Sequence, residues 1–514
     1  MPELALRPSR VEPVALRVVA ERAHADVPPG AGDVVLTGAT VDSRQARPGD
    51  LFGALPGEAM HGATFAAQAV ASGAVAILTD AEGAVLAAEA GVPVLIAEDA
   101  REAMGWASVA VYDDPSRRLA LIGVTGTNGK TTTSFLIEGA LSGHHSVTGL
   151  MGTVEARIGA ESRISERTTV EAPALQAALA LMVERGATAA VTEASSQAIA
   201  LERVTGTHFA VALFTNLQYE HLDFHHTMEE YFAQKARIFA PDVSERGVIL
   251  IDDEWGRKLA REATIPVETV GTRADSPRAD WNVDGATVTE RGGMAFTLIA
   301  PDGTRHAVVS PLPGAINVSN AAGAVVAAHA AGVPIDDAIA GLARARPVPG
   351  RTEVVTLRDD ATPMTVVDYA HTPDGLAAVL DAMRGITPGR VIVVFGCDGL
   401  RDDSKRPGLG QAAATHADIV IVTDENPRTE SPGFIRSRIL AGVDAERPDR
   451  TDVYEIAPRS EAVLAAMRLA TPADTVITTG KGHETTQEID GVHYPYTDAG
   501  AFRDAIEAIA GERA

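Results

Sequence analysis

The sequence predicts an α/β protein of three domains, with a central phosphate-loop domain on a parallel sheet and a C-terminal Rossmann-like domain. Three observations support this prediction. The chain has 514 residues, which is too long for one hydrophobic core and suggests about three domains. Short apolar runs alternate with helical stretches, as they do in parallel βαβ units. Polar loops follow several of these runs, where open parallel sheets place their ligands.

Composition restricts the possible partners. The chain is 46% apolar and 22% charged, which is typical of soluble globular proteins. Its net charge of −25 argues against a nucleic-acid partner, because phosphate backbones require a basic surface. We find no signal-peptide pattern at the N-terminus and no uninterrupted apolar stretch of about 18 residues, so we expect no membrane span. The single cysteine, Cys397, fits a reducing cytoplasm, and we therefore expect a cytoplasmic protein.

Residues 1–117 are predicted to form a small N-terminal α/β domain. Apolar runs predict strands over residues 34–39, 75–79 and 92–96, and a stretch of small residues predicts a helix over 63–72. We interpret the polar segment 41–52, which contains a Pro-Gly turn, as a loop. The polar, proline-bearing segment 112–118 marks the end of this domain.

The segment 119–141 carries the most informative motif. Its apolar run 119–124 predicts a buried strand, and apolar spacing predicts a helix over residues 131–141. A loop rich in Gly, Thr and Asn joins the two and ends in Gly-Lys-Thr. A strand, a glycine loop and a helix N-terminus in this order present backbone N–H groups to a phosphate chain.

Individual residues of this loop suit a nucleotide. Gly126 and Gly129 allow positive φ and a close approach of the backbone to a ligand. Lys130 can place its charge on the terminal phosphates, and the Thr131 hydroxyl can reach Mg²⁺. Five residues, rather than four, separate Gly123 from Gly129, so the loop is a variant of the common pattern. The alternative, a glycine turn without a ligand, is disfavoured because Lys-Thr follows Gly129 directly.

The central domain is predicted to extend over residues 118–345. Its strand at 189–192 leads into Glu193, and its strand at 211–215 leads into a segment that contains His221. The histidines and aspartate of that segment could by themselves indicate a metal hydrolase. The upstream phosphate loop instead favours Mg²⁺, which prefers oxygen ligands.

The C-terminal domain, residues 346–514, begins with the proline-bearing, linker-like segment 347–351. Apolar runs that begin at residues 366, 391, 419 and 475 each read as a strand followed by a polar loop. Three of these loops, 396–407, 424–428 and 480–484, carry many charged side chains. Loops at the same edge of a parallel sheet lie close together, so these three are expected to line one pocket.

Six motifs occur in order along the chain, in segments 123–132, 193–196, 215–223, 317–320, 367–374 and 480–484. Together they resemble the Mur ligases of peptidoglycan precursor synthesis, a cell wall pathway needed for cell shape and cell division. The resemblance covers nearly the whole chain. It is strongest to the third-step (MurE-type) members, which use ATP to add a diamino acid to the D-Glu of UDP-N-acetylmuramoyl-L-alanyl-D-glutamate (UDP-MurNAc-L-Ala-D-Glu) through an acyl phosphate.

The resemblance implies roles for named residues. The implied catalytic residues are Lys130, Glu193, His221 and Lys235. Those implied to bind ATP are Gly126, Thr127, Asn128, Gly129, Lys130, Thr131, Thr132, Asn317, Arg351 and Asp368. The implied ligands of Mg²⁺ are Thr131, Glu193, His221 and Lys235 as its carbamate. Carbamylation would turn an ammonium that repels a metal ion into an anionic oxygen ligand.

It also implies two groups of substrate-binding residues. The nucleotide-sugar peptide is expected to contact Val41, Ser43, Thr168, Thr169, Ser195 and Arg203. The incoming diamino acid is expected to contact Arg401, Glu425, Asn426, Pro427, Arg428, Gly480 and Glu484. The Arg428 guanidinium favours meso-2,6-diaminopimelate, because it can bind the distal carboxylate through two hydrogen bonds.

Four positions depart from the family pattern. Gln197 replaces a histidine, Leu201 a glutamine and Leu400 an aspartate. Glu425 replaces an aspartate of the amino-acid loop and is one methylene longer, so L-lysine or a shorter diamino acid remains an alternative acceptor.

Two other functions were weighed. Folylpolyglutamate synthase shares the nucleotide loop but lacks a separate N-terminal domain of over a hundred residues. A P-loop ATPase switch would hydrolyse ATP without a small acid acceptor, whereas a binding protein without activity is disfavoured by the complete set Lys130, Glu193, His221 and Lys235. We expect small-molecule substrates and a monomer.

Overall fold

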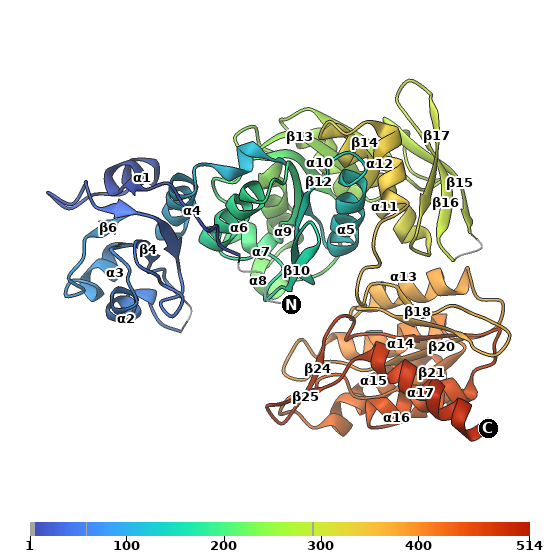
Figure 1. Ribbon diagram of the computed structural model, residues 1–514. Coiled ribbons are helices and arrows are strands. Elements are labelled where there is room, and N and C mark those ends of the chain that lie inside the picture. The colour runs from blue at the N-terminus through green and yellow to red at the C-terminus, as the bar shows by residue number, and fades with distance from the viewer. Residues whose placement is uncertain (1–5, 58, 290–291, 514) are drawn as a thin grey trace. The chain divides into compact units, whose positions relative to one another are not determined.

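The computed structural model describes residues 6–57, 59–289 and 292–513 as a mixed α/β protein (Figure 1). The contacts between residues divide the chain into two compact units. The first comprises residues up to Asp284 together with Leu298–His306 and Asn320–Ala345, and the second comprises Gly285–Thr297, Ala307–Ser319 and the chain from Arg346 onward. The predicted domain boundaries after residues 117 and 345 stay predictions. In the described part of the chain, no helix combines the length and the apolar character needed to cross a membrane.

The N-terminal part of the first unit contains a parallel sheet in the order β3-β4-β5-β6. Its elements are β1 (Val14–Ala15), α1 (Leu16–Arg22), β2 (Val35–Leu36), β3 (Gly38–Thr40), β4 (Asp50–Gly53), η1 (Gly62–Phe65), α2 (Ala66–Ala71), β5 (Ala76–Thr79), α3 (Ala81–Leu86), β6 (Val94–Ile96) and α4 (Ala100–Val111). The predicted strand 34–39 is split, because β2 pairs with β1 and only β3 joins the parallel sheet.

The interpretation of residues 41–52 as a loop is wrong at its C-terminal end. Residues from Asp50 onward form the fully buried strand β4. An aspartate in a buried strand was the misleading signal, and tertiary contacts compensate it. The Asp50 carboxylate accepts hydrogen bonds from the Arg7 guanidinium at 3.0 Å and from the Arg47 backbone N–H at 2.9 Å.

The large sheet has the order β10-β9-β8-β11-β7-β12-β13-β14-β15-β16-β17 and is parallel from β8 to β15. Its strands are β7 (Ala120–Thr125), β8 (Thr148–Met151), β9 (Glu155–Ile158), β10 (Glu161–Ile164), β11 (Ala189–Glu193), β12 (Phe209–Phe214), β13 (Ser244–Leu250), β14 (Val267–Gly271), β15 (Trp281–Val288), β16 (Met294–Ile299) and β17 (Arg305–Ser310). The central strands β7, β11 and β12 are almost continuously apolar and buried, because helices cover both faces of such a sheet.

The helices of this region are η2 (Pro115–Arg118), α5 (Lys130–Leu141), α6 (Ala172–Glu184), α7 (Ser196–Ala200), α8 (Leu222–His225), α9 (Met228–Ala236), η3 (Arg237–Phe239), α10 (Glu254–Glu262), α11 (Ala315–Ala330) and α12 (Ile335–Leu342). Helix α5 packs on β7, β8 and β11, and also against α12. A Cβ atom at Gly139 would lie 2.6 Å from Ala345 Cβ, so this glycine allows the close packing of α5.

The second unit contains a six-stranded sheet in the order β18-β19-β23-β20-β21-β22, which is parallel from β19 to β22. Its elements are β18 (Glu353–Thr356), β19 (Met364–Val367), α13 (Pro373–Arg384), β20 (Val391–Phe395), α14 (Lys405–His416), β21 (Ile419–Val422), α15 (Pro432–Glu446), β22 (Val453–Glu455), α16 (Arg459–Leu469), β23 (Thr475–Thr478), β24 (Thr486–Ile489), β25 (Val492–Pro495) and α17 (Asp498–Arg513). The four strands predicted here are confirmed, and neighbouring strands β21, β20 and β23 end at one edge of the sheet.

Candidate active site

The phosphate loop connects β7 to α5 as predicted. Gly126 has φ +145° and Gly129 has φ +83°, conformations that side chains with a Cβ rarely adopt. Neighbouring side chains also leave no room there, since an added Cβ would lie 1.9 Å from Thr215 Oγ1 at Gly126 and 2.6 Å from Asn320 Oδ1 at Gly129. Backbone conformation and packing therefore both require these two glycines.

Two lysines lie at this loop. Lys130 donates hydrogen bonds to the carbonyl oxygens of Gly126 and Thr127, at 2.9 and 2.8 Å. Lys235, from α9, is 1% exposed and donates to the same Gly126 carbonyl at 2.7 Å. Burial, with the nearby charge of Lys130, holds the Lys235 pKa well below its ordinary value. The Lys235 amine is therefore poised to be neutral.

Oxygen donors gather beside the first turn of α5. Glu193, fully buried at the end of β11, accepts a hydrogen bond from Thr131 Oγ1 at 3.1 Å. Its two carboxylate oxygens also accept from the Thr153 hydroxyl at 3.0 Å and the Thr153 backbone N–H at 2.8 Å. The Thr153 hydroxyl in turn donates to Thr168 at 3.1 Å. Thr131 and Glu193 supply oxygens, the donor type that Mg²⁺ prefers, so these two of the four predicted ligands fit the ion.

The histidines after β12 separate into different environments. His221 has φ +58°, and its side chain is 42% exposed. His225 is buried, and its Nε2 forms a 2.9 Å hydrogen bond with the Ser196 hydroxyl. Burial, together with the Lys235 charge, lowers the His225 pKa to about 4. His225 is thus a neutral packing residue, whereas His221 is accessible to a ligand.

A cavity of about 810 Å³ extends from the N-terminal sheet to the large sheet within the first unit. Four of the residues predicted to bind the nucleotide-sugar peptide line it, namely Val41, Ser43, Thr168 and Thr169. The lining also includes Arg44, Arg47, Arg163 and Arg167. Three of these guanidinium groups pair with carboxylates of the same lining, Arg44 with Asp42, Arg163 with Glu166 and Arg167 with Glu171. An anionic ligand such as a diphosphate would therefore compete with these carboxylates for the arginines.

Two further predicted residues lie behind this lining. The Thr169 hydroxyl donates to the Glu193 carbonyl at 2.8 Å and accepts from the Ser195 backbone N–H at 3.2 Å. Arg203 donates to the Thr169 carbonyl at 3.3 Å and forms an ion pair with Glu171, which lines the cavity, at 2.9 Å. Thr169 thereby links the cavity to β11, the strand that carries Glu193.

In the second unit, Arg351 and Asp368 lie in one cluster. The Arg351 guanidinium stacks 4.2 Å from the centre of the Tyr369 ring. Asp368 is buried and accepts a 2.6 Å hydrogen bond from the Thr352 backbone N–H. Burial raises the Asp368 pKa, although the charge of Arg351 and the hydrogen bonds that the Asp368 carboxylate accepts act in the opposite direction. The ring of His483 also lies against Tyr369, with 5.4 Å between centres.

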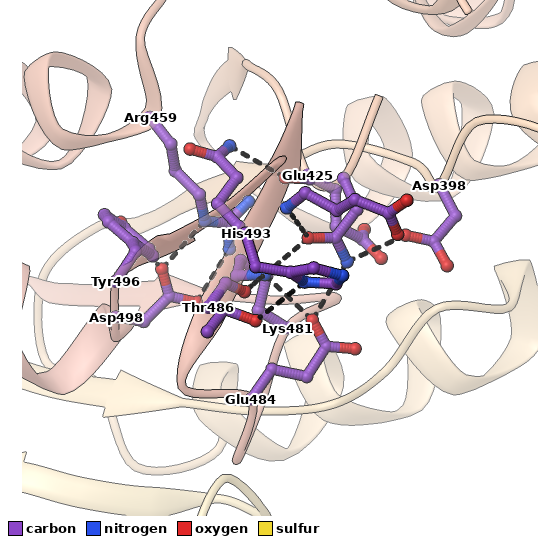
Figure 2. A network of polar contacts seen from close by, with 12 residues as sticks. Asp398, Glu425, Arg459, Lys481, Glu484, Thr486, His493, Tyr496 and Asp498 are labelled. Carbon is purple, nitrogen blue, oxygen red and sulfur yellow. Dashed lines mark hydrogen bonds and ion pairs between the residues drawn. The ribbon is translucent and has the colours of Figure 1, made fainter. Parts of the chain in front are cut away.

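The loops after β20, β21 and β23 lie together, as the sequence predicted, and form one polar network (Figure 2), whereas the pocket expected there stays a prediction. The Asn426 amide donates to Asp398 at 3.0 Å and to Glu484 at 2.9 Å. Lys481, which is fully buried, donates to Asn426 Oδ1 and Glu484, each at 2.8 Å. Arg428 forms 3.4 Å ion pairs with Asp398 and Glu488.

Glu425 is a buried carboxyl group within this network. It is 4% exposed, and its Oε2 finds no hydrogen-bond partner among the residues that the structure describes. Burial and the neighbouring carboxylate of Asp398 raise the Glu425 pKa to about 8. Gly480, with φ +102°, packs directly on this carboxylate, because an added Cβ would lie 2.1 Å from Glu425 Oε2. A bound cation would stabilise the ionised form of this buried carboxyl group.

Other predicted residues lie on two loops of the second unit and on helix α11. Arg401 is exposed on the loop after β20, beside the exposed Leu400. Pro427 accepts a backbone hydrogen bond from Glu430 at 3.0 Å. Asn317 is buried and donates to the Pro313 carbonyl, whereas Asn320, one turn later in α11, accepts from Thr133 at the phosphate loop.

Sequence reasoning missed three residues of these sites. Thr153 holds the Glu193 carboxylate, and Asp398 and Lys481 hold Asn426. Asp398 and Lys481 lie within loops already predicted to form a pocket, so their charge was the available signal. Thr153 follows β8 in a short Gly-Thr turn that carries no recognisable pattern.

Comparison with known proteins agrees with this geometry. Three family models match the chain: the Mur ligase family catalytic domain over residues 35–112, the Mur ligase middle domain over 124–328 and the Mur ligase glutamate ligase domain over 350–482. The chain belongs to the Mur ligase family, and it is an ATP-dependent ligase that forms amide bonds. The resemblance deduced from the motifs is confirmed.

Individual relatives cover nearly the whole chain. The UDP-N-acetylmuramoyl-L-alanyl-D-glutamate–2,6-diaminopimelate ligase of Streptomyces coelicolor is 46% identical over 98% of this chain and 99% of its own. The UDP-N-acetylmuramyl-tripeptide synthetase of Leifsonia xyli is 42% identical over 90% of both chains. A solved structure of a UDP-N-acetylmuramoyl-L-alanyl-D-glutamate–2,6-diaminopimelate ligase has 33% identity and a TM-score of 0.68, and the match covers 97% of this chain and 100% of that one.

Proposed function

We propose that this ligase adds a diamino acid, with meso-2,6-diaminopimelate favoured, to the D-Glu of UDP-MurNAc-L-Ala-D-Glu. The observation that carries the proposal is the chain of contacts from the phosphate loop to the arginine-rich cavity. Thr131 of the loop contacts Glu193, Glu193 contacts Thr153, and Thr153 contacts Thr168 of the cavity lining. A nucleotide-sugar peptide in the cavity could therefore present a carboxylate to a phosphate held at the loop. Relatives named as diaminopimelate ligases support this substrate.

The proposed reaction has two steps. The γ-carboxylate of D-Glu attacks the γ-phosphorus of ATP, and the bond from phosphorus to the bridging oxygen breaks to give an acyl phosphate and ADP. The neutral amine of the diamino acid then attacks the acyl carbon. The tetrahedral intermediate expels phosphate, the nitrogen loses a proton, and an amide bond is formed. Little covalent chemistry is required of the protein, which mainly positions the groups and stabilises charge.

The residues of the phosphate loop have defined tasks in the first step. The backbone N–H groups at the start of α5 bind phosphate oxygens. Lys130 leaves its carbonyl partners and places its charge on the transferred phosphate. His221 and the Glu193 carboxylate complete the groups around the transferred phosphate. Mg²⁺, which Thr131, Glu193 and His221 would hold with a carbamate at Lys235, would neutralise the phosphate charge.

The environment of Lys235 supports its carbamylation. A neutral amine is the form that attacks CO₂, and burial favours the neutral form of this side chain. The new N–C bond forms as the nitrogen loses a proton, so the product is an anionic carbamate. Its charge would balance the neighbouring Lys130, which otherwise opposes the charge of Lys235.

In the second unit, the polar network supplies complementary groups for a diamino acid. Arg428 can bind a distal carboxylate, whereas Glu425 and Glu484 can bind ammonium groups. A second candidate, the same ligase with L-lysine or a shorter diamino acid, is favoured by one observation. Arg428 already has two carboxylate partners, Asp398 and Glu488, which an acceptor carboxylate would have to displace.

An acceptor competition tests the proposal. Equal concentrations of meso-diaminopimelate, lysine, ornithine and diaminobutyrate are offered with ATP and UDP-MurNAc-L-Ala-D-Glu, and the products are identified by mass. We expect the diaminopimelate adduct to predominate. Continued ADP release should require both the UDP-linked dipeptide and a diamino acid. ADP release without the UDP-linked dipeptide would contradict the ligase and favour an ATPase switch. A predominant lysine or ornithine adduct would replace diaminopimelate as the substrate.

We also propose a cytoplasmic monomer. ATP and nucleotide-linked substrates are cytoplasmic compounds, and the single cysteine, Cys397, is buried and free. Cell fractionation and light scattering of the purified protein test location and mass.

A further inference from the structure

A fully buried ion pair lies behind the polar network of the second unit (Figure 2). Arg459 begins helix α16 and Asp498 begins helix α17, and both side chains are 0% exposed. Arg459 Nε donates to Asp498 Oδ1 at 2.7 Å, and a terminal nitrogen donates to Oδ2 at 2.8 Å. The Tyr496 hydroxyl also donates to Asp498 Oδ1, at 3.0 Å. The carboxylate thereby fixes the plane of the guanidinium.

The remaining donors of this guanidinium reach two loops of the network. One terminal nitrogen donates to the Thr479 carbonyl at 2.8 Å, and the other to the Asp424 carbonyl at 3.4 Å. Thr479 immediately precedes Gly480, and Asp424 immediately precedes Glu425. Because β20 lies between β23 and β21 in the sheet, Arg459 connects two loops that are not on neighbouring strands.

The spacing between these loops decides where the Glu425 carboxylate lies. Gly480 Cα packs on that carboxylate so closely that a Cβ there would overlap Oε2. A shift of either loop would therefore move the carboxylate or open a gap beside it. Stability alone does not explain a buried ion pair here, since well-packed apolar residues at such positions are often equally stable.

We propose that Arg459 is a positioning residue for the acceptor amino acid. Its hydrogen bonds to the Asp424 and Thr479 carbonyls set the distance between the loop that contains Glu425 and the loop that contains Gly480. This inference rests on the proposed function, because it assumes that the network binds the diamino acid. Asp498 and Tyr496 orient the guanidinium and have no direct role in binding the acceptor.

The experiment separates acceptor binding from acyl phosphate formation. Hydroxylamine is a small nucleophile that converts an acyl phosphate to a hydroxamate without needing the amino-acid pocket. The full-length enzyme and its variants R459K, D498N and Y496F are assayed with ATP and UDP-MurNAc-L-Ala-D-Glu. One series measures KM and kcat for the diamino acid, and the other measures hydroxamate formation.

Arg468 provides a matched control. It lies on the same helix as Arg459, and its ion pair with Glu512 also joins α16 to α17, but both side chains are half-exposed. R468Q therefore removes an ion pair between the same two helices without touching the network. We expect R459K and D498N to raise the acceptor KM at least tenfold, with hydroxamate formation unchanged. Y496F should raise this KM less, and R468Q should leave it unchanged.

Two results would overturn the inference. The first is an acceptor KM equal to that of the wild type in R459K and D498N. The second is a parallel loss of ligation and hydroxamate formation in soluble variants, which indicates a general structural role. If R459K does not fold, the test rests on the acceptor KM of D498N and Y496F. An unchanged acceptor KM in both variants would overturn the inference. Failure of the proposed function looks different, because the wild type would then form neither hydroxamate nor ligated product.

Discussion

The phosphate loop and the amino-acid network differ in the kind of titratable group that they bury, an amine in one and a carboxyl in the other. At the loop, Lys235 is buried beside Lys130, and its pKa lies well below the ordinary value of a lysine. In the network, Glu425 is buried beside Asp398 and Glu484, and its pKa is raised to about 8. Desolvation is the largest cause of both shifts, and like charges nearby add to it. Each site thus favours the neutral form of its buried group, an amine at the loop and a carboxylic acid in the network.

The two sites also differ in how they are assembled. The loop has glycines at positive φ, and Lys130 donates hydrogen bonds to carbonyls only three and four residues away. The network instead joins side chains from three separate loops, such as Asp398, Asn426 and Glu484. The network therefore depends on the spacing of the strands that carry its loops.

The largest effect is expected at Lys130. K130A removes a charge that stabilises the transferred phosphate, so turnover should fall by about 10²- to 10³-fold or more, with the melting temperature unchanged. ADP release measured with all substrates tests this expectation. R261A, at an exposed position on α10, is the control and should remain active. Ligation by K130A at a near-normal rate would contradict the mechanism.

The next effect concerns the buried amine of Lys235. K235A should lose most activity, because no carbamate can form, and added formate or acetate should restore part of it. The same addition to K130A should restore nothing, since a carboxylate cannot replace an ammonium group. Intact-mass analysis of active wild-type enzyme under CO₂ provides a second measurement. An unmodified Lys235 in fully active enzyme would exclude the carbamate.

A smaller effect should distinguish the acceptors in the network. R428K keeps the charge but loses the two-pronged geometry, so the KM for meso-diaminopimelate should rise about 10- to 100-fold. The KM for lysine, which has no distal carboxylate, should change little. The ratio of kcat/KM for the two acceptors is the quantity to measure. An equal rise for both acceptors would show that Arg428 does not bind the distal carboxylate.

The smallest effect is on stability and follows from the raised pKa of Glu425. Between the ordinary carboxyl pKa and about 8, the folded state retains a proton that the unfolded state has lost. The free energy of unfolding of the wild type should therefore fall as pH rises through this window, by at most about 1.4 kcal/mol per pH unit from this group. E425Q should lack this slope and be the more stable protein at pH 8.

Denaturant unfolding of both proteins from pH 5 to pH 9 gives the two slopes. E430Q is a useful comparison, because Glu430 is paired with Arg406 and its pKa is lowered rather than raised. Identical slopes for the wild type and E425Q would show that Glu425 is ionised throughout, and that the two sites do not both favour the neutral form of their buried group.

Sequence alone was sufficient for the phosphate loop and for the buried central strands that the apolar runs predicted. Gly126, Gly129 and Lys130 are determined by local geometry, and a strand, a glycine loop and a helix are adjacent in the chain. Buried parallel strands are likewise legible as short apolar runs. The charged loops after β20, β21 and β23 were predicted to share a pocket because parallel strands end at one edge.

Only the tertiary structure decided which side chains meet. It turned residues from Asp50 onward into a buried strand, because Arg7 compensates the carboxylate, and it brought Thr153 to Glu193. It also joined Arg459 to carbonyls of two distant loops. Such contacts link residues that are tens of positions apart, and no periodicity records them. Local backbone chemistry is written in the sequence, but burial, and the pKa shifts that follow from it, arise only when the strands are packed.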